Sequence, residues 1–300
     1  MLQFKTLSLE DKPWVDELAA QENSLSASFP FGTIYIWNTN YKHLVARCGG
    51  RMITKLRYGP IPAFAIPAGS GSLAPCVEAV REYAAYKGWP MLFRGLTEVQ
   101  AERLEAECPG AFEYTEDVDF AEYIYLAEKL STYSGKALHG KKNHCNRFEA
   151  ENDWDFVPLT RELIPGCMDM LDRWTEDNAP RLDKSISLEH EAILKTFAAY
   201  EKLGFQGGVL RVQGKIAGFS IGEFAREDCF DVHFEKADAK LNGAYPMVCR
   251  ELTRMLMAKH PGLVYMNRED DMGLESLRRS KLSYKPEFML RKFSARWKDE

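Results

Sequence analysis

The sequence lacks the long apolar run that a membrane-spanning helix needs. Its longest stretch without a charged residue, residues 58–77, is long enough to cross a bilayer but contains four prolines and three glycines. Prolines inside a helix remove hydrogen bonds and clash with the preceding turn, so this segment does not read as a spanning helix. The N-terminal residues MLQFKTLSLED show no basic segment followed by an apolar one, which predicts no export signal. We therefore expect a soluble, cytoplasmic protein.

Cysteine pairs at metal-binding or redox spacing are also missing. The seven cysteines are an odd number, and no two of them form a Cys-x-x-Cys pair. In a chain without an export signal, such cysteines are expected to be reduced and mostly buried. A metal site built from Asp231, His233 and Glu235 is a minor alternative, because no further ligand is spaced nearby; we therefore expect no bound metal.

Positive charge is not in excess. The chain has 39 basic and 44 acidic residues, a formal net charge of −5. This balance argues against a protein that coats DNA, although a local basic groove remains compatible with it because a partner feels the local field. Hydrophobic residues make up 45% of the chain, an ordinary value for a globular protein. The 300 residues suffice for one large domain or two medium ones.

Periodicity and turn signals predict the same order of elements in both halves. In the first half we expect, in order, an extended segment at 4–9, a helix at 11–20, strands at 41–48, 52–58 and 61–66, a helix from 73, a strand at 91–93 and a helix at 97–107. In the second half we expect a strand at 154–158, helices at 161–177 and 188–203, strands at 208–212, 216–224 and 229–234, a helix after the loop 238–244, a strand at 263–266, a helix at 274–282 and a strand at 288–293.

The spacing of this order indicates an internal duplication. Gly71 and Gly243 each precede the long helix of their half and lie 172 residues apart, as do Met91 and Leu263 at the start of the next strand. The prediction is therefore an α/β (α+β) protein made of two tandem units with mixed, mostly antiparallel sheets. We expect the units at 1–130 and 151–300, with a basic connecting helix at 131–150.

The order of elements is that of the acyl-CoA N-acyltransferase (GNAT-like) fold, and two segments carry a more specific resemblance. The first contains Tyr123-Ile124-Tyr125-Leu126, Leu130, Gly135-Lys136, Lys141-Lys142-Asn143 and Asn146-Arg147-Phe148. The second contains Asn267-Arg268-Glu269-Asp270-Asp271-Met272-Gly273-Leu274, Leu277-Arg278, Lys281-Leu282-Ser283-Tyr284 and Pro286. With Phe234-Glu235-Lys236 and Gly243-Ala244-Tyr245, they resemble the phosphatidylglycerol lysyltransferase C-terminal domain family over residues 2–292. That family is similar to the Fem-type aminoacyl transferases, which also pair two GNAT-like units.

The resemblance implies acyl transfer, with aminoacyl transfer from charged tRNA to an amine or hydroxyl acceptor as the favoured form. The donor would be an aminoacyl-tRNA or an acyl-CoA, so the expected partners are a phosphate-containing or small-molecule donor and tRNA, not DNA. The chain has no transmembrane region of the kind found in the membrane lysyltransferases, so the resemblance does not name the acceptor. Two alternatives stay open: an acetyl-CoA-dependent N-acetyltransferase, and a non-catalytic protein that binds a small ligand with the same fold.

The candidate catalytic residues lie on the strand that contains Asp231, His233 and Glu235. Alternate residues of a strand share a face, so these three are expected to point the same way. Transfer to an amine requires a group that removes a proton from the nucleophile, and Glu235, ahead of His233, suits that task. The alternative is a row of polar residues on the wet face of a sheet.

Two segments are candidates for substrate binding. Residues 136–147 hold Lys136, Lys141, Lys142 and Arg147 and two histidines, a concentration of positive charge that would attract the phosphates of CoA, a tRNA acceptor end or a lipid head group. From this segment we select Lys136, Asn143 and Asn146. The alternative is a solvated helix face.

The second candidate segment, residues 267–273, follows the strand expected at 263–266 and leads into the helix expected at 274–282. Sites in α/β frameworks often lie in such loops. Its side chains would bind the amino group of an aminoacyl donor or polar groups of the acceptor. Asp271 has an alternative role as the N-cap of the following helix. The candidates here are Asn267, Arg268, Glu269, Asp271, Arg278 and Lys281.

A third segment, at Lys240, Gly243 and Ala244, is a candidate for cofactor binding. It matches the basic residue and the first glycine of the phosphate loop in acyl-CoA acyltransferases, but Tyr245 replaces a small residue and would crowd a pyrophosphate. The alternative is a strand-to-helix turn in which the glycine only supplies its backbone angle.

Overall fold

The computed structural model describes residues 1–57, 61–178 and 184–298. By its internal contacts the chain divides into two units. Unit 1 contains residues 1–122, 270–273 and 289–300, and unit 2 contains residues 123–269 and 274–288. The boundaries expected from the sequence, at 130 and 150, stay a prediction.

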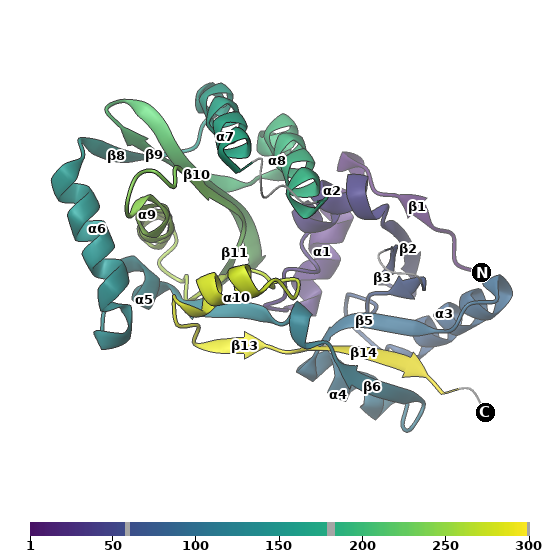
Figure 1. The fold of residues 1–300 in the computed structure, drawn as a ribbon. Coiled ribbons are helices and arrows are strands. Elements are labelled where there is room, and N and C mark those ends of the chain that lie inside the picture. Colours follow the sequence, from purple (N-terminus) through teal and green to yellow (C-terminus); the bar gives the residue numbers. More distant parts are fainter. Residues whose placement is uncertain (58–60, 179–183, 299–300) are drawn as a thin grey trace. The chain divides into compact units, whose positions relative to one another are not determined.

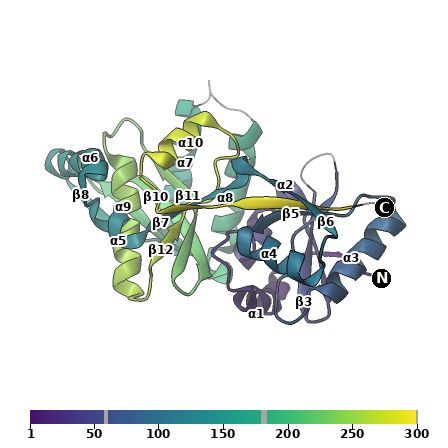
Figure 2. The same ribbon diagram turned by 90° about the horizontal axis from the view of Figure 1, so that it is seen from below.

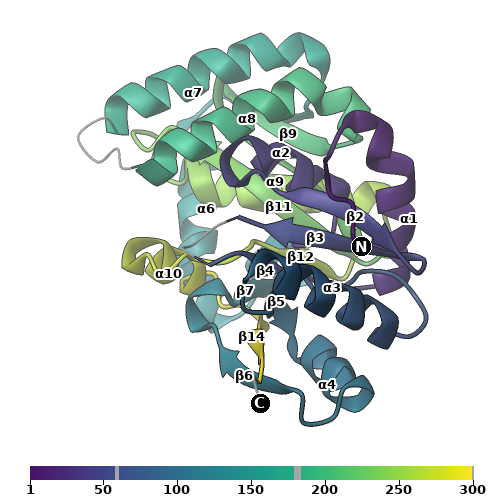
Figure 3. The same ribbon diagram turned by 90° about the vertical axis from the view of Figure 1, so that its right-hand side faces the viewer.

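Unit 1 is built on a seven-stranded sheet with the order β1-β2-β3-β4-β5-β14-β6 (Figure 3). The β4–β5 pair is parallel, and the other pairs are antiparallel. Its elements are β1 (Lys5–Thr6), α1 (Lys12–Glu22), α2 (Phe31–Tyr41), β2 (Leu44–Cys48), β3 (Arg51–Leu56), β4 (Ala63–Phe64), α3 (Ala74–Lys87), β5 (Leu92–Thr97), α4 (Glu98–Glu107), β6 (Phe112–Glu116) and β14 (Lys292–Trp297).

Unit 2 is built on a second seven-stranded sheet with the order β13-β7-β12-β11-β10-β9-β8 (Figure 1). Its β11–β12 pair is parallel. Its elements are β7 (Glu122–Leu126), α5 (Ala127–Thr132), α6 (His139–Glu151), β8 (Trp154–Pro158), α7 (Ile164–Asn178), α8 (Lys184–Leu203), β9 (Gln206–Val212), β10 (Lys215–Arg226), β11 (Cys229–Ala237), α9 (Ala244–Lys259), β12 (Tyr265–Asn267), α10 (Glu275–Leu282) and β13 (Phe288–Leu290). Short 3₁₀ turns lie at Leu9–Asp11, Val118–Phe120, Lys136–Leu138 and Arg161–Leu163.

The two sheets confirm the duplicated order of elements and the predicted fold class. The series β1-β2-β3-β4-β5-β6 in unit 1 corresponds to β8-β9-β10-β11-β12-β13 in unit 2. Each sheet also contains one strand from outside its own series. β14 lies between β5 and β6, and β7 lies beside β12, between it and β13 (Figure 2). The sheets are therefore completed by segments distant in the sequence.

Helices cover both faces of the central strands in unit 2, with α9 on one face and α7 and α8 on the other (Figure 1). A Cβ added at Gly218 of β10 would lie 2.8 Å from Val248 of α9. The next residue, Phe219, packs on Phe197 of α8 with ring centroids 5.5 Å apart. Polar side chains on β10 and β11 are consequently enclosed. The polar surface row considered for Asp231, His233 and Glu235 is wrong, because none of the three is exposed.

Two expected strands are shorter than predicted, at 41–48 and 61–66. Tyr41 ends α2, and the chain leaves that helix through Lys42 with a left-handed φ of 48°. The aromatic and β-branched residues of α2 resemble those of a strand, which hides the helix in the sequence. Phe31, Ile34 and Ile36 of this helix are all buried. Its apolar residues follow no single stripe, so periodicity gives no helix signal. Residues 58–60, part of the strand expected at 52–58, lie outside the described residues.

The close approach of β10 and β11 at Gly222 predicts a large effect of a single methyl group. A Cβ there would lie 1.9 Å from the backbone oxygen of Asp231, at a register shift between the two strands. We expect Gly222→Ala to lower the free energy of unfolding by about 3 kcal/mol, since backbone must move to admit the methyl group. Urea denaturation followed by circular dichroism measures the change.

Gly140→Ala is the matched control, because a Cβ at this position of α6 meets nothing within 4 Å. We expect it to leave stability unchanged or to raise it by up to about 1 kcal/mol, as alanine is the better helix former. Equal stability of the two variants would contradict the described strand pairing.

Candidate functional site

The candidate site in unit 2 is centred on a nearly buried ion pair. Nη2 of Arg268 lies 2.7 Å from Oε1 of Glu235, and the two side chains are 13% and 9% exposed. Glu235 belongs to β11, and Arg268 follows directly on β12. The parallel pairing of these strands, with Asp231 opposite Asn267, brings the two side chains to the same part of the sheet.

Aromatic rings and a lysine enclose this pair. The ring of Tyr284, which is buried, has the guanidinium carbon of Arg268 4.6 Å from its centroid and Nζ of Lys141 3.7 Å from it. Both are cation–π distances. Tyr125 of β7 adds a ring 5.9 Å from the same guanidinium. We call Lys141, Glu235, Arg268, Lys281 and Tyr284 the Arg268 cluster.

Lys281 of α10 fixes the backbone that carries Arg268. Its ammonium donates a hydrogen bond to the Arg268 carbonyl oxygen, and the Tyr125 hydroxyl donates to the Lys281 carbonyl oxygen at 2.8 Å. These two bonds tie α10 and β7 to the end of β12. Lys281 therefore positions Arg268 and also adds a positive charge to the cluster.

The electrostatics of the cluster follow from burial and from its excess of positive charge. Burial raises the pKa of Glu235, although Arg268 and Lys141 oppose this rise. Burial and the charge of Arg268 lower the pKa of Lys141. For Arg268 burial acts to lower the pKa, but Glu235 beside it holds the pKa well above its usual value.

One donor of the cluster is unused. Among the described residues, Nη1 of Arg268 is buried and has no hydrogen-bond partner. Buried polar groups are normally satisfied by a hydrogen bond, so an unpaired guanidinium nitrogen beside a lysine points to an oxygen-bearing ligand. A carbonyl or carboxylate oxygen would fill this place.

His233 lies in a different cluster, among carboxylates. Its Nε2 is 3.1 Å from Glu223, and its Nδ1 is 3.0 Å from Glu269 and 3.4 Å from Asp231. Burial lowers the pKa of His233, but these carboxylates raise it well above its usual value. A protonated ring that donates from both nitrogens has no lone pair with which to accept a proton, which favours Glu235 over His233 as the base.

The expected single row of Asp231, His233 and Glu235 is interrupted by a β-bulge. Phe234 pairs with Ile221 and Val232 with Gly222, so His233 is the additional residue between them. A bulge breaks the alternation of side chains along a strand. The atoms of Asp231, His233 and Glu269 that could bind a metal ion lie within 4.8 Å of one another. The protonated ring of His233 supplies positive charge among these carboxylates.

Lys141 belongs both to the basic segment at 136–147 and to the Arg268 cluster, but it was not selected as a candidate binding residue from the sequence. The selected Lys136, Asn143 and Asn146 are exposed. The signal for Lys141 is its helical phase, since it lies four and seven residues before Cys145 and Phe148, the buried residues of α6. Tyr284 was also not selected as a site residue. The sequence analysis used its motif, Lys281-Leu282-Ser283-Tyr284, only as evidence for the family resemblance.

The loop that follows β12 is shaped by its own side chains. Asn267 accepts a hydrogen bond from the backbone N–H of Glu269 at 2.8 Å, and Asp271 accepts one from Gly273 at 2.9 Å. The N-cap role considered for Asp271 is wrong, because Leu274 occupies the N-cap of α10. Asp271 is buried and is part of unit 1. Arg278 is half-buried on α10.

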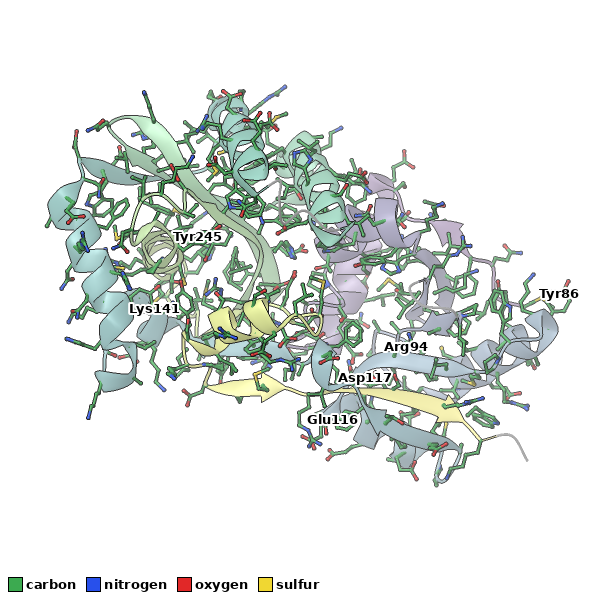
Figure 4. The ribbon with its side chains drawn as sticks, viewed as in Figure 1. Tyr86, Arg94, Glu116, Asp117, Lys141 and Tyr245 are labelled. Carbon is green, nitrogen blue, oxygen red and sulfur yellow. The ribbon has the colours of Figure 1, made fainter. Side chains whose placement is uncertain are left out.

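The candidate cofactor loop is explained in part by packing. Gly243 has φ +93°, and a Cβ there would lie 2.5 Å from the His144 carbonyl oxygen of α6. Lys240 pairs with Asp177 at 2.6 Å. The indole N–H of Trp174 donates to the Tyr245 hydroxyl at 2.9 Å, and Figure 4 shows Tyr245 at the start of α9. Phosphate binding by Lys240, Gly243 and Ala244 stays a prediction.

Comparison with known proteins places these features in a family. The family described as "Phosphatidylglycerol lysyltransferase, C-terminal" matches residues 21–296. An uncharacterized protein of Mycoplasmoides gallisepticum is 29% identical over 181 residues, which are 57% of this chain and 54% of that protein. The match thus spans about half the length of this curated relative.

Solved structures show the same fold. A conserved protein of unknown function from Bacteroides thetaiotaomicron VPI-5482 is 32% identical, with 99% of this chain and 100% of that chain covered and a TM-score of 0.90. The C-terminal domain of a putative lysylphosphatidylglycerol synthetase from Agrobacterium fabrum is 13% identical, with 97% and 93% covered and a TM-score of 0.67. FemX is 9% identical, with 97% and 96% covered and a TM-score of 0.63. Within the described ranges, no helix combines the length and apolarity needed to cross a bilayer.

The buried pair predicts a pH-dependent loss of stability in Arg268→Met. Without Arg268, only Lys141 and Lys281 oppose the effect of burial on Glu235, so its pKa rises further above the unfolded value. The folded state then retains a proton that the unfolded state releases, so stability increases as pH falls through the folded pKa. We expect a loss of about 3 kcal/mol near pH 8 and a smaller loss near pH 5, measured by urea denaturation.

Arg279→Met is the control, because its side chain is 79% exposed and its pair with Glu275 is on the surface. Exposed pairs contribute little to stability, so we expect almost no change at either pH. A loss in Arg268→Met that is the same at both pH values would show that Glu235 is not the group left uncompensated.

Proposed function

This chain belongs to the phosphatidylglycerol lysyltransferase C-terminal family, and from that premise we propose that it transfers an aminoacyl group from a charged tRNA to an amine or hydroxyl acceptor. The observation that carries the proposal is the unpaired Nη1 of Arg268 beside the carboxylate of Glu235. One group stabilises negative charge and the other takes up a proton, which are the two needs of acyl transfer.

The reaction is assigned to these groups as follows. The ester carbonyl of the donor accepts a hydrogen bond from Nη1 of Arg268, which stabilises the oxyanion that forms when the acceptor attacks. The acceptor loses its proton to Glu235 as the new C–N or C–O bond forms. The bond between the carbonyl carbon and the ribose oxygen then breaks, and the ribose oxygen receives the proton from Glu235.

The raised pKa of Glu235 suits both proton transfers. A carboxylate with an ordinary pKa is a weak base at neutral pH, and burial strengthens it as a base. The pair with Arg268 keeps the carboxylate oriented, because the guanidinium holds one of its oxygens. Arg268 in turn is held by the stacked ring of Tyr284 and by Lys281, which binds its carbonyl oxygen.

Positive charge at the cluster supports a phosphate-bearing donor. Arg268, Lys141 and Lys281 outnumber Glu235 there, and α6 carries the further exposed lysine Lys142. Such a surface attracts the backbone of a nucleic acid. Lys136, Asn143 and Asn146 are exposed along the same stretch, and we propose that they contact the acceptor end of the tRNA.

The acetyl-CoA-dependent alternative depends on the loop at Lys240 and Gly243. Its support is the helix N-terminus that this loop opens, since Gly243 is the N-cap of α9 and free N–H groups at such a terminus bind phosphate. Against it, Lys240 is already paired with Asp177, and the α6 backbone approaches Gly243 closely. Aminoacyl-tRNA is therefore the better-supported donor.

Glu235→Gln tests the proposal. The amide keeps the size and the hydrogen bond of the carboxylate but cannot accept the proton, so we expect transfer to slow by about 100-fold or more while donor binding persists. The measurement is the release of labelled amino acid from bulk charged tRNA under single-turnover conditions, with hydroxylamine as the surrogate amine and the uncatalysed rate subtracted.

The matched control is Glu287→Gln, an exposed glutamate paired with Lys129, which we expect to retain the full rate. An unchanged rate in Glu235→Gln would remove Glu235 from the reaction. Consumption of acetyl-CoA in place of charged tRNA would establish the acetyltransferase alternative, and inactivity of the unsubstituted chain toward both donors would favour the non-catalytic one.

A further inference from the structure

Unit 1 contains a polar cavity that none of the candidate residues lines. Its volume is about 160 Å³, and its walls include Ser28, Arg94, Asp117, Phe120, Asp270 and Lys292. All of these residues belong to unit 1. A space of this size suits a small polar molecule.

The floor of the cavity is a buried ion pair that the protein itself satisfies. Nζ of Lys292 lies 2.6 Å from Oε1 of Glu122, with side chains 2% and 5% exposed. The Ser26 hydroxyl donates to the same carboxylate at 3.0 Å, and the backbone N–H of Ala27 donates to its other oxygen at 3.1 Å. The charges of Lys292 and Glu122 therefore compensate each other, whereas two other charges of the wall have no ionic partner among the described residues.

Arg94 and Asp117 are two such charges. In the described part of the chain the side chain of Arg94 makes no hydrogen bond or ion pair, and the carboxylate of Asp117 accepts a hydrogen bond from the uncharged Ser294 hydroxyl. Both side chains line the same cavity, yet they are not paired with each other. Unlike charges held apart in one cavity are complementary to a ligand that carries one anionic and one cationic group.

The backbone of β5 makes room beside Arg94. The next residue, Gly95, has φ +74°, and a Cβ there would meet nothing within 4 Å. β5 also shifts its register against β14 here, between Phe293 and Ala295, as expected for a bulge that opens a strand. The 42% exposed ring of Phe120 adds an apolar wall. The recess is thus built into the sheet.

From this geometry we propose that the cavity binds a small zwitterion of the α-amino acid class. The ligand's carboxylate pairs with Arg94, its ammonium group pairs with Asp117, and its side chain lies against Phe120. The carboxylates of Asp117 and Asp270 in the wall disfavour phosphate and other purely anionic ligands, since like charges repel. The proposal is independent of the transfer reaction at the Arg268 cluster, because its residues belong to unit 1.

Isothermal titration of the full chain with a panel of free L-amino acids tests the proposal. For the amino acid that binds most tightly, the N-acetyl derivative lacks the cation and the carboxamide lacks the anion. We expect each derivative to bind at least about tenfold more weakly than the zwitterion, because each leaves one of the two half-buried charges, Arg94 or Asp117, without a partner in the complex.

Two substitutions test the contacts of Arg94 and Asp117 with the ligand one at a time. Arg94→Gln is expected to bind the amino acid and its carboxamide equally while it still rejects the N-acetyl derivative. Asp117→Asn is expected to show the reverse, equal binding of the amino acid and its N-acetyl derivative with rejection of the carboxamide. Because each variant keeps one preference, misfolding cannot produce this pattern. The control Arg81→Gln alters an exposed arginine of the same unit that pairs with Glu78 and is expected to bind as the unsubstituted chain does.

The proposal is overturned if no free amino acid binds at millimolar concentration, or if Arg94→Gln and Asp117→Asn weaken all three ligands equally. Glu235→Gln distinguishes it from the proposed function, since that variant is expected to lose transfer and keep amino acid binding. Loss of amino acid binding in Glu235→Gln would place the ligand at the Arg268 cluster and contradict the cavity site.

Discussion

The ion pair between Arg268 and Glu235 is the interaction on which the rest of the site depends. Removing two charges from water is unfavourable unless each finds its partner in good geometry, and the chain supplies that geometry from several elements. β11 and β12 bring the two side chains together, Lys281 holds the backbone of Arg268, and Tyr284 covers its guanidinium. The cost of burial is retained in the raised pKa of Glu235 and in the unpaired Nη1 of Arg268, the two properties on which the proposed transfer relies.

The loop that follows β12 contributes residues to both units. β7 completes the second sheet and β14 completes the first, so the chain passes from one unit to the other more than once. Within the loop after β12, Arg268 and Glu269 belong to unit 2, and residues 270–273 belong to unit 1. Arg268 enters the candidate site and Asp270 lines the cavity of unit 1. Side chains of the loop itself fix its backbone: Asn267 accepts a hydrogen bond from the N–H of Glu269, and Asp271 accepts one from the N–H of Gly273.

Most local elements could be predicted from the sequence, with helix α2 (Phe31–Tyr41) as an exception because its apolar residues follow no single stripe. Helical and strand periods gave the duplicated order, and the glycines before the two long helices both have positive φ. The family resemblance pointed to Glu235, Arg268 and Lys281, which the fold brings together. Contacts between distant segments were beyond such reasoning, because nothing in β7 or β14 states which sheet each will join. The bulge at His233 likewise depends on the pairing with β10, and the enclosure of Lys141 under Tyr284 depends on where α6 packs.

The most direct measurement is the binding of bulk charged and uncharged tRNA to the purified chain at one moderate salt concentration, with acetyl-CoA as competitor. If the Arg268 cluster receives an aminoacyl ester, charged tRNA binds more tightly than uncharged tRNA, acetyl-CoA does not displace it, and Arg268→Gln removes the preference while binding of uncharged tRNA persists. Equal affinity for both tRNA forms in the unsubstituted chain, or displacement by acetyl-CoA, would contradict an aminoacyl transfer site at Arg268 and Glu235.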